Sequence, residues 1–132
     1  MGRSRFNDGP GPSQRQLRVA ELIRRRLSDV LNHGDIHDPD LNRLSITVGE
    51  VQCSPDLKVA TAYVLPLGGD HRDEAIEALR RNRHEIRRVV SRGLQLKFAP
   101  DIRFTIDETY DRLDDTRRLF EEDNVRRDLD SD

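Results

Sequence analysis

Apolar residues recur every three or four positions after Ser13, a spacing typical of an amphipathic α-helix. We expect this helix to end at Asn32 and Gly34, because glycine readily adopts the left-handed backbone that closes a helix. The apolar face of the predicted helix consists of Val19, Ala20, Ile23, Leu27, Val30 and Leu31.

The next segment predicts a β-hairpin. Residues 37–40 read His-Asp-Pro-Asp and predict a turn, since proline restricts the residue before it and aspartate closes turns locally. Apolar and polar residues then alternate over residues 44–53 with a change of phase at Gly49, where we expect a β-bulge. Residues 54–56, Ser-Pro-Asp, predict a tight reversal into a second alternating strand over residues 57–65.

Helical spacing returns after Pro66 and the Gly68-Gly69 pair, with Asp70 as the candidate N-cap. Two apolar stripes follow, formed by Ala75, Ile76 and Leu79 and by Ile86, Val89, Val90 and Leu94. Between the stripes, where we expect the helix to bend, lie Asn82, Arg83 and His84. Alternation over residues 102–106 then predicts a third strand, and a weaker helix begins near Asp111.

This order of elements predicts an α+β fold with helices packed on one face of a three-stranded sheet, followed by a C-terminal helix. A chain of 132 residues is long enough for one domain. We expect that domain over residues 13–110, a flexible tail over residues 1–12, and a C-terminal helix and acidic tail, partly disordered, over residues 111–132.

Composition narrows the class of protein. Charged residues make up 36% of the chain and hydrophobic residues 34%, and no apolar run approaches the roughly 18 residues that a membrane-spanning helix needs. No hydrophobic segment follows the basic residues near the N-terminus, so we expect no secretory signal and a cytoplasmic location. Cys53 is the single cysteine, which excludes a disulfide framework and fits a reducing compartment.

Charge is distributed in blocks along the sequence. The net charge is −2 overall, but residues 1–34 and 80–103 are basic whereas residues 35–79 and 104–132 are acidic. Such alternation indicates basic surfaces on particular helices. Lys58 and Lys97 are the only lysines, so the basic blocks are rich in arginine, whose planar guanidinium suits phosphate.

Catalytic and metal-binding patterns are weak. His33 and His37 have helical i, i+4 spacing, but Gly34 and Pro39 argue against a continuous helix there, and no third ligand is evident. No nucleophile elbow and no glycine-rich phosphate loop is present, and Cys53 fits a small buried hydrophobe. We therefore expect no enzyme activity, no metal site and no cofactor.

The basic residues of the predicted helices are the candidate RNA-binding residues, because arginine neutralises phosphate. They are Arg15, Arg18, Arg25, Arg26, Arg80, Arg81, Arg83, Arg87, Arg88 and Arg92, together with Lys97. A solvated helical face without a ligand is the alternative. Tyr63, Phe98 and Phe104 lie in core-like patterns, so we expect binding to rest on phosphate and shape and not on base stacking.

Several segments in this order resemble the ribosome-binding factor A family over about residues 13–120. The resemblance is carried by residues 37–41 (His-Asp-Pro-Asp-Leu), by residues 51–64 with the turn Ser54-Pro55-Asp56-Leu57-Lys58, by Ile86-Arg87, by residues 94–98, and by residues 100–104 (Pro-Asp-Ile-x-Phe) leading to Asp107. Each segment is weak alone, but their order and spacing are specific together.

The resemblance implies a type II KH-like fold with the order α-β-β-α-α-β. It also implies a monomer that binds the free 30S small subunit through 16S rRNA and supports late maturation, including processing of the 16S rRNA 5′ end, without itself cutting RNA. No DNA or membrane partner is implied. Members carry an Ala-x-Gly kink between the two central helices, which Asn82-Arg83-His84 does not match here. Asn82 tolerates left-handed backbone, so we expect it to make the bend.

Two other classes of function remain open on the residues alone. A protein-binding adaptor would dock a partner through the first helix or the acidic tail, with the arginines providing solubility. Capture of a partner that persists at high salt without RNA would favour it. A hydrolase or nuclease would require metal-dependent turnover, for which no residue constellation is evident.

Overall fold

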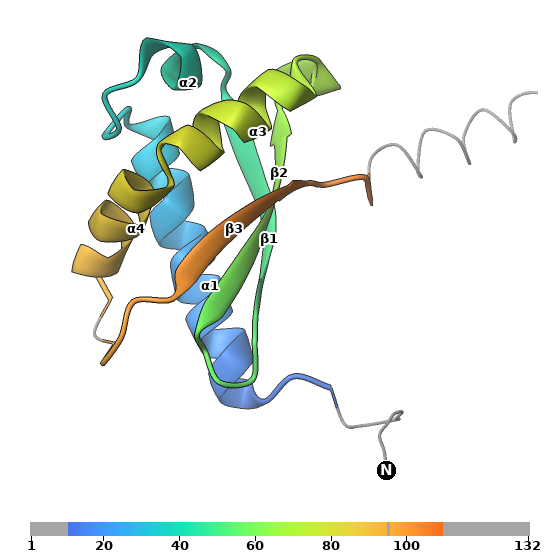
Figure 1. Cartoon of the computed structure of the whole chain (residues 1–132). Helices are drawn as coiled ribbons and strands as arrows, with labels where there is room; N and C mark the ends of the chain where they lie inside the picture. The colour runs from blue at the N-terminus through green and yellow to red at the C-terminus, as the bar shows by residue number, and fades with distance from the viewer. Residues whose placement is uncertain (1–10, 95, 110–132) are drawn as a thin grey trace, which may run out of the picture.

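The computed structural model describes residues 11–94 and 96–109. In chain order its elements are α1 (Gln14–Asn32), α2 (Pro39–Arg43), β1 (Ile46–Cys53), β2 (Val59–Pro66), the 3₁₀ turn η1 (Leu67–Gly69), α3 (Arg72–Arg81), α4 (Arg83–Arg92) and β3 (Asp101–Ile106) (Figure 1). The helix predicted from Asp111, the acidic tail and most of the predicted N-terminal tail lie outside the described residues.

The sheet has three strands in the order β1-β2-β3. β1 and β2 form the predicted antiparallel hairpin, and β2 pairs with β3 in parallel. The register of the hairpin shifts between Val48 and Glu50, which confirms the bulge predicted at Gly49. A Cβ atom at Gly49 would lie 2.5 Å from the Asp107 carboxylate, so glycine lets this side chain approach the bulge closely.

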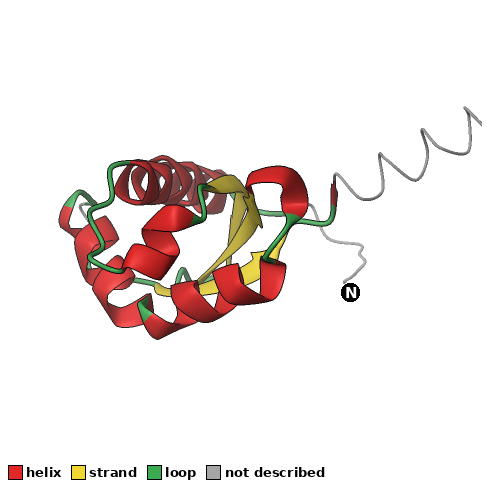
Figure 2. Ribbon diagram, turned by 90° about the horizontal axis from the view of Figure 1, so that it is seen from above, coloured by secondary structure: helices red, strands yellow, loops and turns green. Residues whose placement is uncertain are grey.

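The helices cover one face of this sheet. Alternate residues of β2 are completely buried, among them Ala60, Ala62 and Val64, while the residues between them are half-buried. Ile102 and Phe104 of β3 extend the same buried face. The helices complete the core with Ile23 and Leu27 of α1, Leu79 of α3 and Ile86 of α4, all with no exposed surface. Figure 2 shows α1 and the α3–α4 pair as separate helices beside the twisted sheet.

Helix α1 follows its sequence pattern closely. The Ser13 hydroxyl accepts from the Gln16 backbone N–H at 3.1 Å, and the Gln16 side chain accepts from the Ser13 N–H at 2.8 Å, which forms a capping box. The helix ends at Asn32 as predicted, and Gly34 has a φ of +68°. Among the described residues, no helix has the length and apolar character needed to cross a membrane.

A short helix replaces the turn predicted at residues 37–40. The Asp38 carboxylate accepts from the backbone N–H groups of Asp40 (3.0 Å) and Leu41 (3.4 Å), so it acts as an N-cap. Pro39 occupies the first helical turn, where a missing N–H leaves no bond unmade. The prediction of a simple turn was wrong because the two residues that suggested it also start a helix.

The start of α3 also differs from expectation. Its N-cap is His71 and not Asp70. His71 has a φ of +60°, in the left-handed region, and its side chain makes no capping bond. The chain arrives from η1, where Gly68 and Gly69 have φ values of +77° and +76°, so the glycine turn sets the direction in which α3 starts.

Candidate nucleic-acid interface

Asn82 forms the joint between α3 and α4, at the bend predicted from the sequence. It is at once the C-cap of α3 and the residue before α4. Its backbone has φ −99° and ψ 13°, so the expected left-handed conformation was wrong. The bend is held by the side chain instead, because Nδ2 donates to the Ala78 carbonyl at 2.8 Å and to the Asp38 carboxylate at 2.7 Å.

Asp38 connects α2 to this bend. Its Oδ2 atom accepts from Asn82 and from Arg81 Nη2 at 2.8 Å, while Oδ1 caps α2. These hydrogen bonds, first from Asn82 and then from Arg81, lower the pKa of Asp38 from 3.8 to about 2. We call Asp38, Arg81 and Asn82 the kink clasp. The clasp gives the His-Asp-Pro-Asp segment a structural role, since it fixes the angle between the two arginine-bearing helices.

Three of the predicted RNA-binding arginines form ion pairs within the chain. Arg81 pairs with Asp38, and Arg25 lies 3.2 Å from the Glu21 carboxylate. Arg88 forms a close pair with Glu85, and this hydrogen bond lowers the pKa of Glu85. Each of these guanidinium groups already has an anionic partner, so its charge is partly neutralised.

Two further arginines of that set hold the fold together. Arg26 Nη2 donates to the Val89 carbonyl at 3.3 Å and so links α1 to α4. Arg87 Nη2 donates to the Ala99 carbonyl at 2.5 Å and fixes the chain that leads into β3. Both side chains are half-buried, and the Nε atom of each has no hydrogen-bond partner in the described part of the chain.

The remaining candidates are exposed, and their side chains form no ion pair or hydrogen bond with any residue that the structure describes. They are Arg15, Arg18, Arg80, Arg83 and Arg92. Lys97 is exposed too, and its Nζ atom lies 5.6 Å from the centre of the Phe98 ring. These side chains form no ion pair among the described residues, although Arg92 lies near enough to the Glu85 carboxylate to help lower its pKa.

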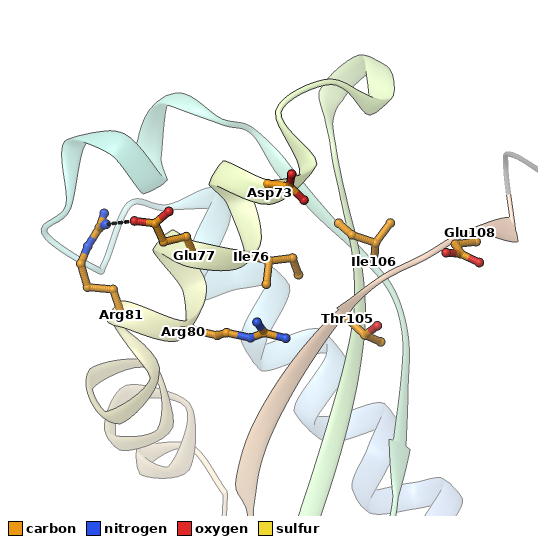
Figure 3. A pocket seen from close by; sticks show the side chains of 8 residues that line it. All are labelled: Asp73, Ile76, Glu77, Arg80, Arg81, Thr105, Ile106 and Glu108. Atoms are coloured by element: carbon orange, nitrogen blue, oxygen red, sulfur yellow. Dashed lines mark ion pairs between the residues drawn. The ribbon is translucent and has the colours of Figure 1, made fainter.

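A cleft of about 770 Å³ separates α3 from β3. Figure 3 shows Arg80 directed toward Thr105 of β3, whereas Arg81 points to the other side of α3, toward Glu77 and α2. Three carboxylates line the cleft, those of Asp73, Glu77 and Glu108. Its charge is therefore mixed, and the unpaired arginines are not concentrated there.

The described residues contain no group of three His, Cys, Asp or Glu side chains that could hold a metal ion. Cys53 is half-buried, and burial raises the pKa of its thiol, which opposes reactivity at neutral pH.

Of the three aromatic residues predicted to lie in the core, only Phe104 is fully buried. Phe104 is 4% exposed, as expected, and Tyr63 is half-buried with its hydroxyl donating to Gln52 at 3.2 Å. Phe98, however, is 76% exposed, so its prediction was wrong. α4 ends at Arg92 and β3 begins at Asp101, which leaves Phe98 in a connecting loop where no strand alternation applies. The adjacent Lys97 and Pro100 were the sequence signals of that loop.

The element order α-β-β-α-α-β, with β2 and β3 parallel, defines a type II KH-like fold, and α2 is inserted after its first helix. Solved structures agree. A solution structure from Thermotoga maritima, described as a putative ribosome binding factor A, is 31% identical with a TM-score of 0.62, covering 76% of this chain and 94% of that one. The crystal structure of ribosome-binding factor A from Thermus thermophilus is similar in fold, with a TM-score of 0.59 at 22% identity over 69% of this chain and 94% of that one.

The family model for ribosome-binding factor A matches residues 15–120, and the chain belongs to that family. Ribosome-binding factor A from Dinoroseobacter shibae is 73% identical over 98% of this chain and 96% of the relative. The protein of that name from Ruegeria pomeroyi is 66% identical over 98% and 99%. Another structural neighbour, 24% identical with a TM-score of 0.54 over 67% of this chain and 90% of that one, is a Thermus thermophilus model fitted into the map of a 30S complex. The resemblance noted from the sequence is confirmed.

Proposed function

We propose that this chain is a ribosome assembly factor that binds the free 30S subunit through its 16S rRNA. Membership of the ribosome-binding factor A family, with 73% identity over almost the whole length of one relative, is the observation that carries the proposal. Support of late subunit maturation, including processing of the 16S rRNA 5′ end, belongs to the same proposal. In this proposal the protein acts in the cytoplasm, where these subunits assemble.

The unpaired basic side chains supply the binding energy in this proposal. Neutralising rRNA phosphates releases counterions, so the affinity falls steeply as salt rises. Arg83 and Arg92 of α4 are exposed and lack ion pairs among the described residues, which makes them ready phosphate contacts. The chain itself cuts no RNA in this mechanism, and a separate nuclease acts on the rRNA 5′ end.

The direct test is co-sedimentation of the full chain with purified 30S subunits and with 70S ribosomes across a salt series. We expect binding to 30S that weakens with salt and no binding to 70S. Absence of 30S binding at low salt would overturn the proposal. Partner capture that survives high salt and nuclease treatment would then favour the protein-binding adaptor.

A matched pair of double variants tests the arginine assignment. Arg83→Glu/Arg92→Glu reverses two unpaired charges on α4, and we expect a loss of about 100-fold in 30S affinity, on the order expected for two charge-assisted contacts. Arg43→Glu/Arg103→Glu makes the same change in net charge at exposed residues of α2 and β3 and should bind within about twofold of wild type. Equal affinity of the two variants would contradict the placement on α4.

Arg81 is unsuitable for such a test, although the sequence makes it a candidate RNA-binding residue. Arg81→Glu would bring a new carboxylate beside Asp38, whose own carboxylate is 14% exposed and lies 2.8 Å from the Arg81 guanidinium. Like charges at that distance would open the kink clasp. Loss of binding in that variant would report a changed helix angle and not a lost RNA contact.

A further inference from the structure

A groove of about 750 Å³ is lined in part by residues of the β1–β2 turn and of the start of α1, which lie at the same end of the domain (Figure 1). It is formed by Arg15 of α1, residues 55–58 of the turn, Arg87 of α4 and residues 96–99. We call it the Phe98 groove. It is separate from the cleft between α3 and β3, with which it shares no lining residue.

Phe98 is the unusual feature of this groove. Its side chain is 76% exposed, although burial of an aromatic ring is strongly favourable. Leu57 and Leu96 continue the apolar surface, and each is half-buried against the core. The groove therefore combines an apolar floor with an exposed ring, one face of which lies beside the Lys97 ammonium while the other is open to a ligand.

The charge around this apolar surface is positive. Four basic side chains line the groove, those of Arg15, Lys58, Arg87 and Lys97, against the single carboxylate of Asp56. That carboxylate is already engaged, because it accepts from the Ser54 hydroxyl at 2.7 Å and from the Lys58 backbone N–H at 3.0 Å. Arg15 also lies in the first turn of α1, where the helix dipole is positive. An anionic ligand suits this field.

The walls of the groove are fixed before any ligand binds. The Asp101 N–H donates to the Lys58 carbonyl at 2.8 Å, which joins the start of β3 to the β1–β2 turn. Arg87 holds the Ala99 carbonyl at 2.5 Å, directly after Phe98. Little ordering of the protein is needed on binding, which favours affinity.

We propose that the Phe98 groove binds one unpaired nucleotide of an RNA strand, with the base stacked on the Phe98 ring and the phosphate beside Lys58 and Lys97. Stacking on an exposed aromatic ring flanked by cations is a general way to hold single-stranded nucleic acid. The inference rests on the proposed function and deepens it, because it adds a single-strand contact to a protein expected to rely on phosphate and shape.

An acidic peptide would also be attracted by the basic side chains, but it would leave the ring without a partner. The Lys97 ammonium lies over one face of Phe98, 5.6 Å from the ring centre, which leaves the other face for a base in a groove that Arg15 and Lys58 also line. The combination of an open ring and adjacent cations matches the two parts of a nucleotide.

The test uses the full chain, a short fluorescein-labelled oligouridine, and a strand of the same length without bases. Phe98→Leu keeps an apolar side chain but removes the ring, and we expect its affinity for oligouridine to fall about 5- to 100-fold. Phe98→Tyr keeps the ring and should bind within about twofold of wild type. The base-free strand should bind all three proteins equally weakly, since it has nothing to stack.

A matched control separates stacking from the mere loss of an exposed apolar group. Leu67 is 79% exposed and lies in η1, away from the groove, so Leu67→Ala should leave RNA affinity unchanged. Phenylalanine ring signals in NMR give an independent readout, because the chain has four phenylalanines and Phe98→Leu identifies the one that matters. We expect oligouridine to shift the Phe98 ring protons upfield.

Failure of this proposal is distinguishable from failure of the proposed function. If wild type and Phe98→Leu bind 30S and oligouridine equally and the Phe98 signals do not move, the nucleotide site is overturned while 30S binding stands. If wild type does not bind 30S at any salt concentration, the proposed function is overturned, and the nucleotide site that rests on it is overturned as well. If oligoglutamate moves the Phe98 signals and oligouridine does not, the groove takes acidic peptide and the proposal is wrong.

Discussion

Both ends of this domain carry basic residues, but they differ in whether the basic side chains form ion pairs. At the α2 end, the kink clasp satisfies Arg81 and Asn82 with one carboxylate from Asp38. At the other end, the Phe98 groove leaves Lys58 and Lys97 exposed around an open aromatic ring. The comparison teaches that basic residues count as binding residues only after the partners supplied by distant segments are known.

The largest expected effect is at the groove end. Lys58→Glu/Lys97→Glu should lower the affinity for single-stranded RNA about 100-fold, because two phosphate contacts become repulsive. It should also reduce the slope of log affinity against log salt by roughly 1.4, which corresponds to two contacts on a single strand. Fluorescence anisotropy across a salt series measures both quantities.

If the double variant keeps the wild-type slope of log affinity against log salt, the groove end does not supply these contacts and the contrast between the two ends fails. Such a result would place the phosphate contacts elsewhere. The unfolding midpoint should stay close to wild type, because neither lysine side chain forms an ion pair with a described residue.

Substitutions in the kink clasp should lower the stability of the fold and leave the affinity of the Phe98 groove for RNA unchanged. Asn82→Ala removes the bonds to Ala78 and Asp38, and we expect the free energy of unfolding to fall by about 1 to 3 kcal/mol. Urea denaturation measures this change. Arg83→Ala, at the next residue and exposed, is the control and should cost less than about 0.5 kcal/mol.

Measuring the oligouridine affinity of Asn82→Ala shows whether the effect stays at the kink. Under conditions where Asn82→Ala is folded, it should bind oligouridine as wild type does, since α2 and the β1–β2 turn that lines the groove lie at opposite ends of the domain (Figure 1). A parallel loss of stability and of oligouridine affinity would show that the two ends are coupled through α4.

The smallest expected effect concerns pH. The pKa of Asp38 is lowered from 3.8 to about 2 in the folded chain, so its charged form stabilises the fold above pH 4. That contribution is lost as the pH falls from about 4 to about 2. Asp38→Asn should therefore show a shallower fall in melting temperature over this range than wild type.

Thermal unfolding followed by circular dichroism at several pH values between 2 and 5 tests this expectation. Asp40→Asn is the matched control, because the Asp40 carboxylate lies 3.8 Å from Arg81 and is 69% exposed. It should keep the wild-type profile. Identical profiles for wild type and Asp38→Asn would remove Asp38 from the acid response.

Much of the fold was predictable because local periodicity reports local structure. The start of α1 after Ser13, the bulge at Gly49 and the bend at Asn82 are each encoded within a few residues of where they occur. Helix α2 was missed because aspartate and proline start turns and helices alike. Loop residue Phe98 was misplaced because apolarity predicts burial only where an element supplies a periodic face.

The sequence predicted which basic residues the candidate site contains, but it did not predict which of them lack a partner in the folded chain. The sequence determined which helices carry arginine, which positions within the periodic helices and strands face the core, and which family the chain resembles, since these depend on residue order alone. Which charges are free depended on the tertiary structure, because Arg81 meets Asp38 across 43 positions of sequence and Arg26 meets Val89 across 63. Pairing and burial are properties of segments brought together by folding, and no local pattern reports them.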